Sequence, residues 1–330
     1  MSLSRRTVLA GLAGLPAFNL AAVTRPASAH PVSGLEVLGA PNASTVVLVR
    51  LIESGGLAEA APGATFRLWR DTDDLRAGLV SGRSRLITTP IHVPANLANR
   101  GLPMRLLAII SMGHLSVVTA DPSIATFADL AGKKIVGFFK NDMPDLVFRT
   151  IARKEGIDPD RDIELTYVGT PMEAAQMLVA GQAETAILNE PPATGAIMMA
   201  GQTGRALRRA ISLQQAWGRH FGKPRIPMAG VALHQSLIDD SPELLAALRT
   251  GLAPAKDWVL ANRTEAAQLA ERTMQSRPAV FERSLDHFNI DVVSAAAIRP
   301  EIETFYRAIL DLSPATLGGT LPPDEFYLDL

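Results

Sequence analysis

Residues 170–191 read TPMEAAQMLVAGQAETAILNEP and describe a helix followed directly by a strand. Thr170 is a typical N-cap residue, and Gly181 is typical of the position just after a helix. Residues 185–188 form a short apolar strand, which Asn189-Glu190-Pro191 ends. A helix that leads straight into a buried strand is characteristic of α/β proteins, in which helices cover a mostly parallel sheet.

The same pattern occurs 99 residues earlier in the chain. Asp71 or Thr72 caps a helix that Gly82 ends, and the strand that follows at residues 86–87 stops at Thr88-Thr89-Pro90. The sequence LVSG at residues 79–82 matches LVAG at residues 178–181. The same offset aligns two expected strand starts, at residues 35 and 134. The sequence therefore predicts two similar α/β lobes.

The chain outside these lobes is mainly helical in character. An apolar strand is expected at residues 226–233, and a helix begins at Ser241-Pro242, with Ser as N-cap and Pro in the first turn. Further helices are expected at residues 264–276 and around residues 300–312. The stretch from residue 312 to residue 323, rich in Pro and Gly, is expected to lie on the surface as an arm.

Length and composition narrow the function. The 330 residues suit one large or two medium domains, and a net charge of −1 argues against nucleic-acid binding, which needs basic patches. The absence of cysteine excludes disulfides, Cys-ligated metals and thiol nucleophiles. The histidines (His30, His92, His114, His220, His234 and His287) have no spacing typical of a metal site, so no metal or cofactor is expected.

Residues 1–29 are expected to be an export signal. Arg5-Arg6 precede an apolar run that ends near Ala27-Ser28-Ala29, where cleavage would follow Ala29. The paired arginines favour a twin-arginine signal, with an ordinary secretory signal or an N-terminal anchor as alternatives. No later segment is long and apolar enough to span a membrane. The mature chain is therefore expected in the periplasm, not embedded in the membrane.

Several short motifs resemble those of a known family. They are Gly39-Ala40-Pro41, TFADLAGKKI at residues 126–135, GIDP at residues 156–159, AGQAE at residues 180–184 and Asn189-Glu190-Pro191. Together with the export signal and the repeat, they resemble the periplasmic substrate-binding proteins of ABC importers. The similarity is to the branch that handles nitrate, sulfonates, taurine and thiamine-precursor pyrimidines, and it covers about residues 32–310.

The resemblance implies a type II periplasmic binding protein: two α/β lobes, a ligand cleft between them and a helical C-terminal segment. Lobe one would comprise residues 30–115 and 228–330, and lobe two residues 116–227. The carboxyl ends of the strands and the helix N-termini would face each other across the cleft, which suits polar or anionic ligands.

The implied function is the capture of a small polar or anionic organic solute, such as a sulfonate, nitrate or a pyrimidine. A monomeric binding protein would deliver this small-molecule ligand to an ABC permease and its ATPase, without catalysis. One alternative is a sensor subunit for a membrane receptor kinase. Another is an enzyme resembling the thiamine-precursor pyrimidine synthases.

The candidate ligand-binding residues follow the strands expected to face the cleft. They are Asn42, Ser44, Thr88, Thr89, Asn141, Asp142 and Glu190. A structural role is the alternative for three of them: helix capping for Asn42 and Ser44, and a charge that offsets a helix dipole for Asp142. Glu190 could bind an amino group of the ligand, pair with a base of lobe one as a hinge strut, or be exposed. Trp69 or Trp217 could stack on a planar ligand, or belong to the core or the lobe surface.

Overall fold

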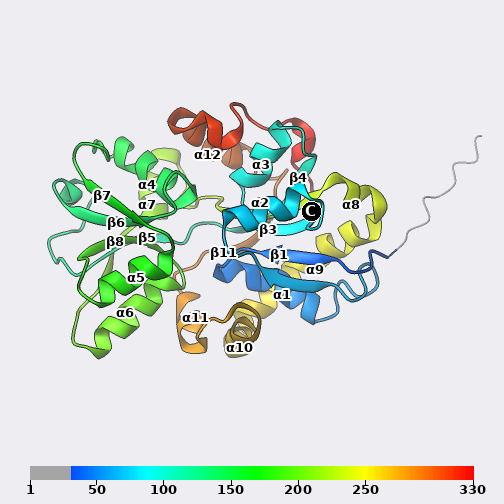
Figure 1. Cartoon of the computed structure of the whole chain (residues 1–330), viewed down its shortest axis with the longest axis horizontal. Helices are drawn as coiled ribbons and strands as arrows, with labels where there is room; N and C mark the ends of the chain where they lie inside the picture. Colours follow the sequence, from blue (N-terminus) through cyan, green and yellow to red (C-terminus); the bar gives the residue numbers. More distant parts are fainter. Residues whose placement is uncertain (1–30) are drawn as a thin grey trace, which may run out of the picture.

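The computed structural model describes residues 31–330, so the expected export signal and its cleavage site lie outside the described residues. Two α/β lobes lie side by side, each built on one mixed sheet with helices on its faces (Figure 1). The expected fold class, two similar α/β lobes with a helical C-terminal segment, is confirmed.

Lobe one is built on a six-stranded sheet with the order β11-β4-β10-β3-β1-β2. Parallel pairs join β1 to β2 and to β3, and antiparallel pairs join β10 to β3 and β4, and β11 to β4. The strands are β1 (Glu36–Gly39), β2 (Thr65–Leu68), β3 (Leu86–Pro90), β4 (Met104–Ser111), β10 (Ala229–His234) and β11 (Ile290–Ser294).

Lobe two is built on a five-stranded sheet with the order β7-β6-β8-β5-β9. Its strands β6, β7 and β8 are parallel, and β5 runs antiparallel between β8 and β9. The strands are β5 (Leu115–Thr119), β6 (Lys134–Phe138), β7 (Glu164–Val168), β8 (Thr185–Asn189) and β9 (Arg208–Ser212).

The two sheets repeat one arrangement of strands. The order β2-β1-β3 in lobe one corresponds to β7-β6-β8 in lobe two, and an antiparallel strand lies next to β3 and to β8. The helices α2 (Thr72–Val80) and α5 (Pro171–Val179) are 99 residues apart at both ends. Asp71 caps α2 by accepting from the N–H groups of Asp73 and Asp74, and Thr170 caps α5 by accepting from Glu173. The predicted repeat is therefore present.

The remaining helices cover the two sheets and fill the space around them. In lobe one these are α1 (Val46–Glu53), α3 (His92–Asn99), α8 (Gln235–Asp240), α9 (Pro242–Ala261) and α10 (Arg263–Met274). In lobe two they are α4 (Met143–Lys154), α6 (Pro192–Gln202) and α7 (Leu213–Phe221). The C-terminal part adds α11 (Pro278–Ser284) and α12 (Arg299–Leu312).

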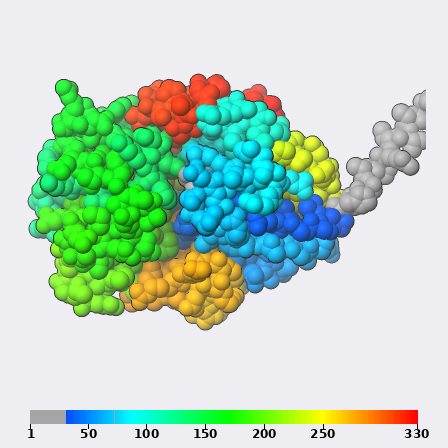
Figure 2. All heavy atoms as spheres, viewed as in Figure 1, coloured from blue at the N-terminus to red at the C-terminus, as the bar shows by residue number. Residues whose placement is uncertain are grey.

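Two C-terminal helices bridge the lobes on opposite sides of the seam between them. The helix α12 packs on α4 of lobe two, and its Tyr306 hydroxyl donates to the carbonyl of Ile91 in lobe one, at 2.8 Å. The helix α11 packs on α6 of lobe two. Figure 2 shows the lobes in close contact, with α12 in red above the seam and the α10–α11 region in orange below it.

Residues 312–323 lie largely on the surface, as expected, but buried side chains in this segment and just after it anchor the C-terminal tail. Leu317, Phe326 and Tyr327 are buried in the core of the protein. The amides of Asn96 and Asn99 on α3 donate to the carbonyls of the tail residues Ala315, Thr316, Leu317 and Thr320. The few apolar residues among many Pro and Gly residues are enough to anchor the tail, which the composition alone did not indicate.

Within residues 31–330, none of the helices is long and apolar enough to cross a lipid bilayer.

Candidate functional site: a pocket between the two lobes

A narrow pocket of about 70 Å³ lies where the lobes meet. Residues of both lobes and of the two segments that connect them line it. They are Ala40, Pro41, Asn42, Trp69, Pro90, His114, Leu115, Phe138, Phe139, Met143, Pro144, Pro171, Asn189, Met228 and Ala229.

The fold brings these residues together because parallel strands in each sheet end at the same edge. Ala40, Trp69 and Pro90 lie at the carboxyl ends of β1, β2 and β3, while Phe138 and Asn189 end β6 and β8. In open α/β sheets, ligands bind outside these strand ends. The two sheets turn these edges toward each other, so one pocket receives residues from both lobes.

Two asparagine side chains face the pocket with unused hydrogen-bonding groups. Asn189 is 8% exposed, and its Oδ1 is buried without a hydrogen-bond partner among the described residues. The Oδ1 of Asn42 accepts from the backbone N–H and the hydroxyl of Ser44, at 3.1 and 2.7 Å. No described residue accepts from the Nδ2 of Asn42. The buried Oδ1 of Asn189 carries a free-energy cost that a hydrogen bond from a bound solute would remove.

His114 is the titratable side chain in this lining. Its ring stacks on Phe288 with a centroid distance of 4.5 Å, and its Nδ1 lies 2.8 Å from the Ser111 hydroxyl. Burial lowers the pKa of His114 to about 3, because the charged imidazolium would lose its hydration. His114 therefore presents a neutral ring at physiological pH.

Each of the two helices α4 and α5 that begin at the pocket has one of its first N–H groups bonded by its cap residue and another replaced by proline. The backbone N–H of Met143 at the start of α4 donates to the carboxylate of Asp142, at 2.6 Å. Both α4 and α5 carry a proline in their first turn, Pro144 and Pro171, which has no N–H group to offer. Each of these two N-termini therefore has fewer N–H groups to offer an anion than an uncapped helix without proline.

A contact between the lobes closes the site beside the pocket. The Nε2 of His92, at the start of α3 in lobe one, lies 3.0 Å from the Oδ1 of Asp142 in lobe two. Burial opposes ionisation of Asp142, but the His92 ring and the Met143 N–H outweigh it and lower the pKa of this carboxyl. Asp142 is therefore charged at neutral pH and ties the two lobes together.

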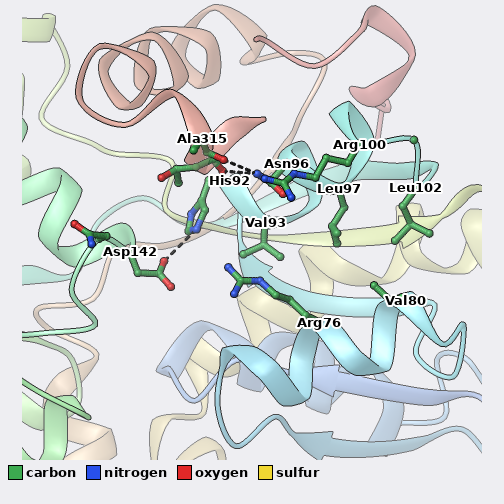
Figure 3. Close-up of a pocket in the computed structure, with 13 residues that line it drawn as sticks. Arg76, Val80, His92, Val93, Asn96, Leu97, Arg100, Leu102, Asp142 and Ala315 are labelled. Atoms are coloured by element: carbon green, nitrogen blue, oxygen red, sulfur yellow. Dashed lines mark hydrogen bonds and ion pairs between the residues drawn. The ribbon is translucent and has the colours of Figure 1, made fainter. Parts of the chain in front are cut away.

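A second, larger and more open hollow of about 820 Å³ lies outside this contact (Figure 3). It is lined by α2, α3 and the C-terminal tail of lobe one and, from lobe two, by Asn141 and Asp142. Figure 3 shows Asp142 pointing across to His92, with Arg76 and Arg100 at the lobe-one side. Its walls come largely from one lobe, so we regard it as the outer mouth of the cleft and the narrow pocket as the ligand site.

The predicted site residues divide among three places. Asn42 caps the turn before α1, as its structural interpretation expects, and it also lines the pocket, where a contact with a ligand remains a prediction. Asn141 and Asp142 line the outer hollow. Ser44, Thr88 and Thr89 are fully buried behind the strand ends and line neither hollow. The Thr88 hydroxyl accepts from the Ala40 N–H, at 2.9 Å, and so supports the turn that carries Asn42.

Glu190 belongs to the interior of lobe two and lines neither hollow. Its Oε1 accepts from Nε of Arg209 on β9 at 2.8 Å, and its Oε2 accepts from the N–H and hydroxyl of Thr194 at 3.1 and 2.7 Å. Of the three interpretations (ligand binding, pairing with a base of lobe one, exposure), the geometry is nearest to the second, but the base is Arg209 of lobe two. The neighbouring residue, Asn189, is the one that reaches the pocket.

Sequence reasoning missed most of the apolar and aromatic lining. Trp69 was weighed as a stacking residue, and the structure places it in the pocket wall with its Nε1 donating to the Thr88 carbonyl at 3.4 Å. Trp217 instead packs on Phe221 in the core. Phe138 and Phe139 are the last two residues of the strand predicted at residues 134–139, and the position at a strand end was the available signal for them.

No group of His, Asp and Glu side chains within residues 31–330 is arranged to hold a metal ion.

The arrangement of two mixed sheets around a common cleft defines the type II periplasmic binding protein fold. Residues 87–274, more than half of the chain, match the model of the NMT1-like family, and the chain therefore belongs to this family. None of the curated proteins matches the sequence.

Solved structures with this fold cover almost the whole chain. An ABC transporter protein from Parabacteroides distasonis has a TM-score of 0.73 at 19% identity, over 91% of this chain and 99% of its own. The periplasmic aliphatic sulphonate-binding protein SsuA from Escherichia coli has a TM-score of 0.67 at 16% identity, over 90% and 99%. The periplasmic nitrate-binding protein NrtA from Synechocystis PCC 6803 has 0.65 at 15%, over 88% and 85%. At such identities these likenesses establish the fold.

Proposed function

We propose that this protein is the solute-binding component of an ABC importer, which captures a small molecule between its lobes and delivers it to a permease. The observation that carries the proposal is the pocket formed by the strand ends of both sheets. A solute that contacts both walls stabilises the closed arrangement over an open one, and a permease can recognise that difference.

The contact between His92 and Asp142 fits such a closing mechanism. It joins α3 of lobe one to the start of α4 in lobe two, next to Met143 in the pocket wall. A contact between the lobes adds to the free energy of closure without touching the solute. Both the solute and the contact between His92 and Asp142 then favour the closed arrangement.

The proposed division into lobes follows the sequence expectation of residues 30–115 plus 228–330, and residues 116–227. Two connecting segments support it: one between the end of β4 and the start of β5, the other between α7 and β10. The pocket residues His114 and Met228 lie on these connections. Hinge motion at these connections would open the pocket directly.

The partners and location follow from the same proposal. Proteins with this fold include periplasmic sulphonate-binding and nitrate-binding proteins. We propose that this chain is likewise exported, with a twin-arginine signal cleaved after Ala29, and acts as a monomer in the periplasm with an ABC permease and its ATPase. A binding role without catalysis is supported by the lining, whose titratable side chain, His114, is held neutral.

Native mass spectrometry of the mature protein, purified from exported material without added solute, tests this proposal. A bound small mass that is lost on unfolding, and that returns with saturable one-to-one binding when added back, is the expected result. Conversion of the bound molecule to a product would contradict it, as would a protein that binds no small molecule under any condition tested.

A further inference from the structure

We propose that the pocket takes a small, uncharged, planar solute that carries an N–H group beside a C=O group, such as a primary amide or a lactam, and excludes anions. This inference rests on the proposed function and names the class of solute for the same pocket. The sulphonate- and nitrate-binding proteins that share the fold would therefore differ from this protein in the charge of what they bind.

The first observation is the absence of charge from the pocket wall. Of the fifteen described residues that line it, none is Arg, Lys, Asp or Glu. Arg85, just before β3, and Lys140, just after β6, are outside the lining. Arg85 pairs with Asp240 at 2.9 Å, and Lys140 lies over the ring of Tyr167. An anion buried here would lose its hydration without gaining a cation in return.

The second observation concerns the groups that could replace a cation. Backbone N–H groups at helix N-termini bind anions in many α/β proteins. Here the Met143 N–H already donates to Asp142, and the Glu173 N–H donates to Thr170. The charged carboxylate of Asp142 also sits at the helix end nearest the pocket, where it repels a second negative charge.

The third observation is the pair of asparagines. An amide side chain presents one acceptor and one donor side by side, and its complement is a group with an N–H next to a C=O. Asn189 has a buried, unpartnered Oδ1, and Asn42 has an Nδ2 without an acceptor among the described residues. These two residues come from opposite lobes, so a solute bonded to both would hold the lobes together.

The remaining wall suits a flat molecule. Trp69, Phe138, Phe139 and Met143 line the pocket together with Met228 from the connecting segment. Aromatic and thioether side chains pack against ring or amide faces. The residual volume of about 70 Å³ is roughly half that of an engineered cavity of about 150 Å³ that binds benzene. A small amide fits directly, and a ring requires the lobes to part slightly.

The test uses pairs of probes that differ in charge and hardly in shape. Acetamide and acetate, benzamide and benzoate, and nicotinamide and nicotinate are titrated against the solute-free mature protein at pH 7.5, with methanesulfonate and nitrate as further anions. We expect at least one amide to bind saturably, and to bind at least tenfold more tightly than its carboxylate partner. Any anion that binds as tightly as, or more tightly than, the amide probes overturns the inference and leaves the proposed function standing.

If none of the probes binds, the inference is tested by identifying the small molecule released from the purified protein. An uncharged planar molecule bearing an amide or lactam supports the inference, and an acid overturns it. If the protein holds no small molecule and binds no probe, the proposed function itself fails.

A variant of similar side-chain size tests whether the preference for amides over carboxylates arises in this pocket. Asn189→Leu removes the amide while keeping the size of the side chain, and we expect it to weaken binding of the best amide at least tenfold. Asn262→Leu, at the junction of α9 and α10 away from the pocket, is the matched control and should leave binding unchanged. Unchanged binding of the amide by Asn189→Leu would overturn the inference that Asn189 forms hydrogen bonds with the solute.

Discussion

Asp142 combines two tasks that can be separated by one substitution. It caps α4 through the Met143 N–H and holds the contact with His92 across the lobes. Asn caps a helix about as well as Asp does, so Asp142→Asn keeps the cap and removes the charge. We expect solute affinity to fall about fivefold, the equivalent of roughly 1 kcal/mol for a hydrogen bond to a charged carboxylate. Isothermal titration calorimetry measures this change.

A second capping aspartate supplies a matched control for that substitution. Asp71 caps α2 in lobe one, the counterpart of α5, where its side chain accepts from two N–H groups of its own helix. Asp71→Asn should leave solute affinity unchanged. Equal affinities of Asp142→Asn and the unchanged protein would show that the contact with His92 does not contribute to closure.

The sequence position of Glu190 suggested that it binds the ligand, whereas its environment in the structure indicates an ion pair that stabilises lobe two. Its carboxylate is buried, and it accepts from Arg209 and Thr194. Glu190→Gln leaves the Arg209 guanidinium without its counter-charge, so we expect the free energy of unfolding to fall by about 2–3 kcal/mol. Solute affinity should change less than twofold. A large loss of affinity with unchanged stability, measured by urea unfolding and calorimetry, would support the ligand interpretation instead.

His114 should make stability depend on pH in a defined window. The pKa of His114 is about 3 in the folded protein and about 6.5 in an unfolded chain. Between pH 6.5 and pH 3, the unfolded state is therefore protonated at His114, whereas the folded state is not. The free energy of unfolding is therefore expected to fall as the pH decreases from about 6.5 toward 3, with a contribution of up to about 1.4 kcal/mol per pH unit.

Urea unfolding at pH 4.5, 5.5 and 6.5 checks this slope. His114→Gln has no titrating ring and should show a smaller loss of stability across the same range, whatever its stability at pH 6.5. Identical slopes in both proteins would mean that His114 becomes protonated in the folded state.

At the scale of elements, a hydrogen-bond network fixes the turn between β6 and α4. Phe139 and Asn141 in this turn have positive φ angles of 49° and 62°, which non-glycine residues seldom adopt. The Asn141 N–H donates to Asp145, whose carboxylate also accepts from Arg149 and from the Tyr167 hydroxyl, at 2.8, 2.7 and 2.6 Å. The strained turn keeps Phe139 in the pocket wall and Asn141 at the outer hollow.

Tyr167→Phe tests this network. The hydroxyl donates to Asp145 and accepts from Arg149, so its loss is expected to lower the free energy of unfolding by about 1–3 kcal/mol. Tyr327→Phe is the matched control, because the Tyr327 hydroxyl is buried without a partner among the described residues. This second variant should be neutral or slightly more stable in urea unfolding. Similar losses in both variants would contradict the role of the network.

Elements with strong local signals were predicted well from the sequence. The capped helices α2 and α5, the strand β8 and the late helices α9 and α12 all appear close to their expected bounds, because cap residues, glycine and apolar spacing mark them locally. Elements such as α3, α7 and β9 were missed. The helix α3 contains Pro94 in its first turn, and α7 lies in a polar stretch whose buried side includes Trp217.

At the scale of the whole molecule, the repeat predicted two lobes but not the pocket between them. The pocket depends on how the lobes approach each other, and the contacts of α11 and α12 with lobe two take part in setting that approach. Local sequence patterns carry little information about such long-range packing. The rule that ligands bind at strand ends led to the region in which the structure has a pocket between the lobes. It did not distinguish Asn189, in the pocket wall, from Glu190, in the core of lobe two.

The central claim is that a solute closes the two lobes, and a distance between spin labels on the two lobes measures this most directly. The chain has no cysteine, so Val80→Cys on α2 and Met172→Cys on α5, both at exposed positions, would carry the only two labels. We expect a broad distribution of longer distances in the solute-free protein, and a shorter, narrower one when the solute released from the purified protein is added back. An unchanged distribution with the solute bound would contradict the account.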